Sequence, residues 1–135
     1  MIPVLRATPD VTLKPAPGGF RILAALDAAT KVLGRDLTLT AGANDHTSGR
    51  HPLGEAYDVR TRDLSTPELL RLVEFLGRVL GERFYVSYEV PARPQDAALA
   101  AIAVVNPDAS GPHLHIQVRR GTEYPPFDTP PGQRA

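Results

Sequence analysis

The stretch that decides the fold is residues 113–119, which read His-Leu-His-Ile-Gln-Val-Arg. Side chains of a β-strand point alternately to its two faces, so Leu114, Ile116 and Val118 would share one face. The opposite face would carry the polar set His113, His115, Gln117 and Arg119. This alternation predicts a strand that other elements cover on one side and leave open on the other.

Three further segments alternate in the same way and predict strands, namely residues 37–41, 56–60 and 84–90. Asp58 lies on the polar face of the second of these segments, and Glu89 on the polar face of the third. If all four strands belong to one sheet, both carboxylates converge with His113 and His115 on its polar face.

Two segments show the helical spacing of apolar residues. The first is residues 19–33, where Phe20, Leu23, Leu26 and Leu33 recur and Gly34 follows as a stop. The second begins with Thr66 as the predicted cap and Pro67 at the first helical position, and it ends at Gly81. Its apolar stripe consists of Leu69, Leu72, Val73, Leu76, Val79 and Leu80. A short helix over residues 96–103 is also predicted.

These elements predict an α+β fold in a single domain that spans residues 1–135, with its core over residues 19–120. We expect a central, mostly antiparallel sheet with the two main helices on one face. The polar face would remain open as a metal-binding cleft. The proline-rich segment 121–135 is expected to form an irregular tail.

Composition excludes several classes of function. Lys and Arg together number 15, as do Asp and Glu, so the formal net charge is zero and a nucleic-acid partner is not expected. No segment has the length and hydropathy of a membrane span, and residues 1–6 lack the pattern of a classical signal peptide. We therefore expect a soluble protein, and a monomer. The chain has no cysteine, so a transition metal would be held by histidine and carboxylate ligands.

All four histidines fall in two short stretches, residues 45–58 and 112–115. A catalytic zinc site uses three protein ligands and keeps one position for water. His51, Asp58 and one histidine of the 113–115 pair meet that count. The turn residues between His51 and Asp58 would bring the loop histidine back over the strand.

The order and spacing of these residues resemble the zinc D-alanyl-D-alanine carboxypeptidases and their phage endopeptidase and hedgehog-like relatives. That signature is matched here by Ser48, His51, Gly54, Ala56 and Asp58, followed by His113-Leu114-His115. The flanking residues, 46–48 and 59–61, look most like the phage-type members. The resemblance covers roughly residues 37–118.

The resemblance implies an enzyme with one zinc ion per chain, a hydrolase that cuts a peptide bond in the stem peptides of peptidoglycan. It assigns the metal ligands to His51, Asp58 and His115, and it leaves the choice between carboxypeptidase and endolysin-type endopeptidase open. A cytoplasmic or phage-associated location would fit such a cell-wall metallopeptidase.

The same resemblance suggests His113 as the residue that acts on the reacting groups. Many members carry a glutamate as general base three residues before the third ligand, where this chain has Pro112. His113 is therefore our first candidate for the catalytic base or donor, and Glu89 is the second. Arg50 and His46 are candidates for binding a substrate carboxylate, and Ser48 of the motif is a third substrate-binding candidate.

Two alternatives remain open at this stage. The same ligands could hold a structural zinc in a non-catalytic module of a larger assembly, or serve a hydrolase of another small amide. Arg50 and Glu89 could also be ordinary solvated surface charges.

Overall fold

One mixed β-sheet organises the chain, as seen in the computed structural model, which describes residues 2–43 and 50–122. Within these residues the sheet has six strands, in the order β1-β2-β3-β6-β4-β5. They are β1 (Leu5–Ala7), β2 (Leu37–Ala41), β3 (Ala56–Arg60), β4 (Phe84–Val90), β5 (Ala103–Val105) and β6 (His113–Val118). The helices are α1 (Pro17–Leu33), the 3-10 turn η1 (His51–Leu53), α2 (Thr66–Leu80) and α3 (Ala97–Ile102).

The centre of the sheet is antiparallel and its two edges are parallel. Strand β6 pairs antiparallel with β3 on one side and with β4 on the other. At the edges, β1 runs parallel to β2 and β5 runs parallel to β4. The predicted α+β class and mostly antiparallel sheet are confirmed. The two edge strands were not predicted, because three residues are too few to show an alternating pattern.

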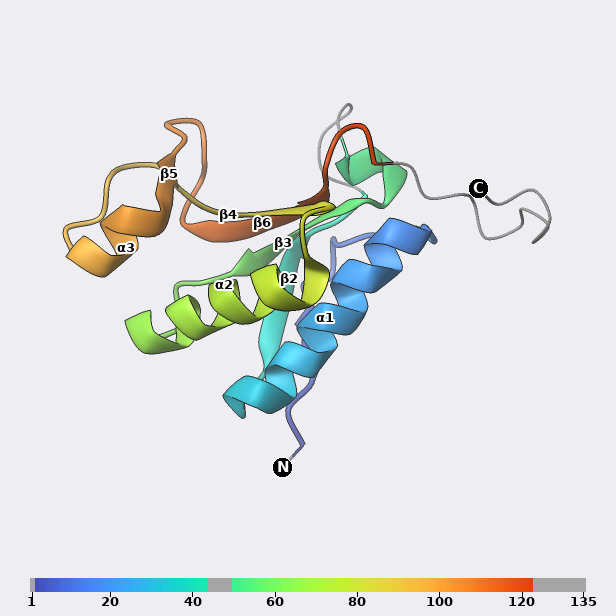
Figure 1. Cartoon of the computed structure of the whole chain (residues 1–135), viewed down its shortest axis with the longest axis horizontal. Coiled ribbons are helices and arrows are strands. Elements are labelled where there is room, and N and C mark those ends of the chain that lie inside the picture. The colour runs from blue at the N-terminus through green and yellow to red at the C-terminus, as the bar shows by residue number, and fades with distance from the viewer. Residues whose placement is uncertain (1, 44–49, 123–135) are drawn as a thin grey trace.

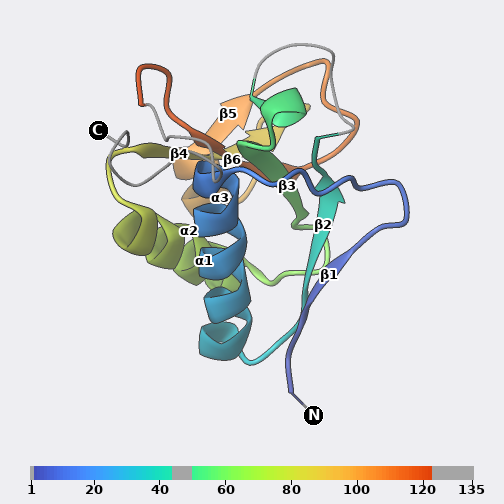
Figure 2. The ribbon, with the colours of Figure 1, turned by 90° about the vertical axis from the view of Figure 1, so that its right-hand side faces the viewer.

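Helices α1 and α2 cover one face of the sheet, as Figures 1 and 2 show from two directions. The apolar faces of all four predicted strands contribute to this core, as does the inner side of each helix. The largest fully buried side chains include Tyr57, Ile22, Leu26, Leu72, Leu114 and Ile116. The turn η1 lies on the opposite, open side of the sheet. No helix among the described residues is long and apolar enough to cross a membrane.

The first helix differs from its prediction at its start. It begins at Pro17, two residues earlier than expected, because proline suits the first helical turn. Phe20 was predicted to be on the buried face, but 48% of its surface is exposed. The buried face instead uses small residues beside larger ones, namely Ile22, Ala25, Leu26 and Ala29.

The cap of α2 lies one residue before the predicted position. Ser65, not Thr66, is the N-cap, and its Oγ accepts a hydrogen bond from the backbone N–H of Glu68 at 3.2 Å. The Glu68 carboxylate accepts from the backbone N–H of Ser65 at 2.8 Å in return, which completes a capping box. That hydrogen bond, with smaller contributions from Arg35, lowers the pKa of Glu68.

We therefore predict that Ser65→Ala lowers the free energy of unfolding by about 1 kcal/mol, because the backbone N–H of Glu68 loses its side-chain acceptor. Thr66→Ala is the matched control, and it should change stability by less than about 0.5 kcal/mol. Urea unfolding of the three proteins measures both effects. Equal losses in the two variants would contradict the assignment of the cap.

Candidate metal centre

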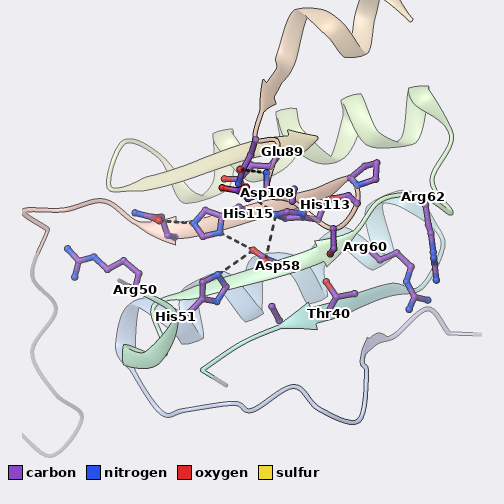
Figure 3. A pocket seen from close by; sticks show the side chains of 17 residues that line it. Thr40, Arg50, His51, Asp58, Arg60, Arg62, Glu89, Asp108, His113 and His115 are labelled. Atoms are coloured by element: carbon purple, nitrogen blue, oxygen red, sulfur yellow. Dashed lines mark hydrogen bonds and ion pairs between the residues drawn. The ribbon is translucent and has the colours of Figure 1, made fainter. Parts of the chain in front are cut away.

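The register of the three central strands brings the predicted site residues together in two rows across the open face. Asp58 of β3 lies opposite His115 of β6, and His115 lies opposite Ser87 of β4. In the next row, Arg60, His113 and Glu89 are aligned in the same way. The convergence expected from strand parity is therefore confirmed, and five of these six residues line an open cleft of about 930 Å³ (Figure 3).

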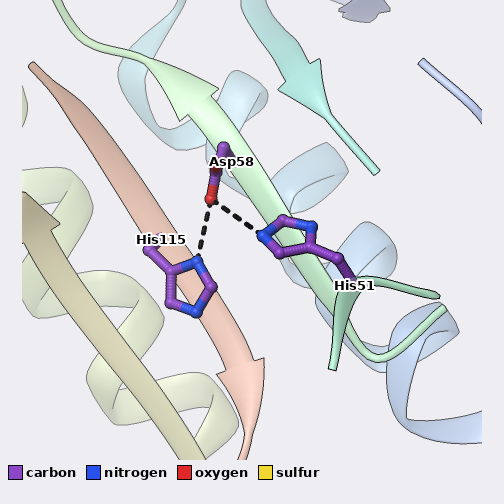
Figure 4. A group of neighbouring side chains, drawn as sticks. All are labelled: His51, Asp58 and His115. Carbon is purple, nitrogen blue, oxygen red and sulfur yellow. Dashed lines mark hydrogen bonds and ion pairs between the residues drawn. The ribbon is translucent and has the colours of Figure 1, made fainter. Parts of the chain in front are cut away.

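Three of the cleft residues form a group that could hold a metal ion. One ligand atom each from His51, Asp58 and His115 lies within 4.8 Å of the other two. Asp58 Oδ1 is 2.9 Å from His115 Nδ1 and 3.5 Å from His51 Nε2. Figure 4 shows both imidazoles pointing at the same oxygen of this one carboxylate.

The two distances from Asp58 to the histidines are close to the ligand spacing around a tetrahedral ion, and the distance between the two histidine ligand atoms is within 4.8 Å. Ligands held about 2.1 Å from such an ion lie about 3.4 Å apart along each edge of the tetrahedron. The two measured distances to Asp58 bracket that value. Asp58 and His51 are largely buried, at 8% and 3% exposed, so their side chains are held by the surrounding protein. The donor set of two imidazoles and one carboxylate therefore suits a divalent metal.

Close backbone contacts place His51. Its Nδ1–H donates to the carbonyl oxygen of Gly42 at 3.1 Å, which turns Nε2 toward Asp58. The turn η1 ends at Gly54, whose φ of 74° is the left-handed conformation that glycine tolerates. Gly19 at the start of α1 contacts this residue, since a Cβ atom on Gly19 would lie 1.8 Å from the Gly54 carbonyl oxygen.

Gln117 orients the third candidate ligand. Its Nε2 donates to the Val118 carbonyl at 3.4 Å, and its Oε1 accepts from His115 Nε2–H at 2.7 Å. His115 Nδ1 is thereby left facing Asp58. A hydrogen bond to the second ring nitrogen is the usual way in which proteins fix a metal-binding histidine. The sequence placed Gln117 on the polar face, but nothing in the pattern distinguished it from a solvated residue.

The surroundings of the site shift the pKa values of Asp58 and His115. Burial raises the pKa of Asp58, but hydrogen bonds from His115 and His51 and their positive charge lower it by more, so it lies well below the usual range. For His115, burial lowers the pKa, whereas the hydrogen bonds with Asp58 and Gln117 and the nearby carboxylates raise it above its usual value. The metal-free site therefore favours a charged carboxylate beside a protonated histidine.

A second polar pair lies beside the three candidate metal ligands. His113 Nε2 is 3.2 Å from Glu89 Oε1 and 3.8 Å from Asp58 Oδ2. Its Nδ1–H donates to the Gly111 carbonyl oxygen at 3.0 Å. Because Nδ1 carries this hydrogen, Nε2 is the ring nitrogen that faces the carboxylates. His113 and Glu89 thus form a polar pair at the edge of the site.

Of the three substrate-binding candidates, only Arg50 lies within the described residues. Arg50 lines the cleft, but its guanidinium already pairs with Glu55 at 2.9 Å and contacts the Arg119 carbonyl at 3.4 Å. His46 and Ser48 lie outside the described residues. Pro112, where a family glutamate would stand, lines the cleft without an ionisable group.

Comparisons of the chain with protein-family models, with curated proteins and with solved structures give no match. The resemblance to the zinc carboxypeptidases therefore stays a prediction that rests on the motif residues. What the chain does must be inferred from the geometry of this centre.

We predict that the wild-type protein is stabilised by added zinc and that Asp58→Ala and His51→Ala are not, because two ligands are too few to retain the ion. Asp108→Asn is the control, since Asp108 lines the same cleft outside the three-residue group. Thermal melts and metal analysis after gel filtration measure the effect. If either ligand variant kept one bound metal per chain, that residue would not be a ligand.

The pKa shifts also predict how metal binding depends on pH. Because the pKa of His115 is raised in the folded protein, its protonated form stabilises the metal-free fold. This contribution is fully present below about pH 6.5 and is lost as the pH rises through the pKa of the folded state. Metal requires the unprotonated ring, so it competes with that proton. The zinc-induced rise in melting temperature should therefore grow steadily between pH 5.5 and 8. Asp58 stays charged throughout this window because its pKa is lowered. A zinc effect independent of pH would contradict histidine ligation.

Proposed function

We propose that the chain is a zinc-dependent peptidase that hydrolyses a peptide bond in peptidoglycan stem peptides. The observation that carries this proposal is the group of three candidate metal ligands in an open cleft, with the His113–Glu89 pair directly beside it. The sequence order of the residues, His51, Asp58 and then His113-Leu114-His115, supports the same family of enzymes.

The donor set favours zinc among the common metals. Magnesium and calcium prefer oxygen ligands and higher coordination numbers, whereas two imidazole nitrogens and one carboxylate are typical of catalytic zinc. Among the described residues the group has three members, which leaves a fourth tetrahedral position for water. The cleft gives that position access to a substrate.

Each residue has a distinct part in the proposed reaction. A bound zinc ion would lower the pKa of a water molecule to about 7 and polarise the carbonyl of the scissile bond. His113 Nε2, facing the site and paired with Glu89, would take the proton of the attacking water and pass it to the leaving amine. Gln117 would keep His115 in its ligating orientation.

One contact favours a second candidate function. His113 Nε2 is 3.8 Å from Asp58 Oδ2, so a modest side-chain rotation would let it become a fourth ligand. A site closed by four protein ligands would be a structural zinc centre in a non-catalytic module.

Replacement of each strand histidine separates these functions. We predict that His113→Ala keeps its zinc and loses about 10²- to 10⁴-fold in turnover, because the proton-transferring group is gone. His115→Ala should lose both zinc and turnover. Turnover is measured on purified peptidoglycan stem peptides, with chelator and zinc re-addition as controls.

The outcomes distinguish the candidates. Zinc loss in His113→Ala, together with no chelator-sensitive hydrolysis by the wild type, would support the structural centre instead. If His113→Ala kept both zinc and near-normal turnover, the base would be Glu89, and Glu89→Gln should then show the loss.

A further inference from the structure

Two arginines of the cleft have no ionic partner among the described residues. Arg60 is the last residue of β3 and Arg62 follows in the loop, and both line the cleft. Neither side chain forms an ion pair or a hydrogen bond with any part of residues 2–43 or 50–122. Arg50, in contrast, is neutralised by Glu55 at 2.9 Å. Figure 3 shows Arg50 and the other two arginines at opposite ends of the cleft, with Asp58 between them.

The strand register fixes the position of this basic end relative to the metal ligands. Arg60 is two residues beyond Asp58, so both side chains share the open face about 7 Å apart along the strand. Across the sheet, Arg60 lies opposite His113, which contacts Glu89. The basic end therefore adjoins the His113–Glu89 pair and not the His51 side of the centre.

Two unneutralised guanidinium groups in one concave site favour an anion. The cleft as a whole carries both signs of charge, since Asp58, Glu89 and Asp108 also line it, but Figure 3 shows Arg60 and Arg62 together at one end. Such a local excess of positive charge in a concave site attracts an anion, and the walls of the site reduce screening by solvent. The planar guanidinium matches a carboxylate, which it can bind through two parallel hydrogen bonds. Arg60 is half-buried and Arg62 is exposed, so both guanidinium groups are within reach of a ligand in the cleft.

We propose that Arg60 and Arg62 form a subsite for a substrate carboxylate on the leaving-group side of the scissile bond. The side follows from the register, since the pair that would protonate the leaving amine occupies the same row as Arg60. This inference rests on the proposed peptidase function. The carboxylate is either the free C-terminus of the departing residue, as in a carboxypeptidase, or an acidic group within a longer departing fragment.

Binding to the metal-free protein tests the subsite without turnover. The probes are two matched pairs of peptides, each differing only in one carboxylate. The first pair is acetyl-Lys-D-Ala-D-Ala and its C-terminal amide. The second is acetyl-Ala-D-Glu-amide and acetyl-Ala-D-Gln-amide. Dissociation constants are measured by calorimetry or by amide chemical shifts.

The wild type should bind the carboxylate member of at least one pair roughly tenfold or more tightly, and Arg60→Gln and Arg62→Gln should each reduce that preference. Discrimination in the first pair identifies a terminal carboxylate, and discrimination in the second an internal one. Arg71→Gln, an exposed arginine of α2 on the other side of the sheet, is the matched control and should bind as the wild type does.

Melting temperature and zinc retention of each variant establish that the fold and the metal group are intact. If Arg60→Gln were unfolded, the exposed Arg62→Gln and the conservative Arg60→Lys would decide the question. The subsite is overturned if the wild type does not discriminate within either pair, or if the arginine variants keep the full preference.

The experiments can rule out the carboxylate subsite and the peptidase function separately. Zinc-dependent hydrolysis of stem peptides without carboxylate discrimination would leave the peptidase and remove the subsite. Discrimination through Arg60 and Arg62 in a protein that hydrolyses none of the peptides when zinc-loaded would leave an anion-binding cleft and remove the peptidase.

Discussion

Asp58 of β3 and His115 of β6 lie directly opposite each other in an antiparallel ladder, and this register determines the arrangement of both faces of the sheet. On the open face it brings a carboxylate and an imidazole within 2.9 Å. On the covered face the same pairing sets Val59 beside Leu114 and Tyr57 beside Ile116 in the core. A slip of one residue would move the apolar set to solvent and the ligands into the core at once. Packing of the core therefore protects the geometry of the metal centre.

The buried negative charge of Asp58 is unfavourable unless neighbouring groups compensate for it. A carboxylate at 8% exposure needs compensation, and in the metal-free protein the two imidazoles provide it. A divalent cation would take over this role and would displace the additional proton from His115. The hydrogen bonds of His51 to the Gly42 carbonyl and of His115 to Gln117 do not depend on the ion, so the ligands are oriented beforehand.

Strand periodicity was enough to predict much of this arrangement. The four longer strands and the face shared by Asp58, Glu89, His113 and His115 follow from alternation, and both main helices follow from the helical spacing of apolar residues. The edge strands β1 and β5 could not be found, because their pairing is a tertiary contact of only three residues each. Ser65 and Thr66 are both good caps, and only the backbone geometry distinguishes them. The part played by Gln117 depends on a hydrogen bond across one strand face, which no spacing rule reveals.

The contact between Gly19 and the Gly54 carbonyl has a mechanical consequence for the centre. His51 belongs to a turn that abuts the first turn of α1, whereas Asp58 and His115 belong to the sheet. An ion bound by all three would therefore act as a cross-link between the helical layer and the strands. Relative sliding of these layers would strain the coordination sphere, and loss of the ion would give α1 more freedom to move. Metal binding would in this way be coupled to the rigidity of α1.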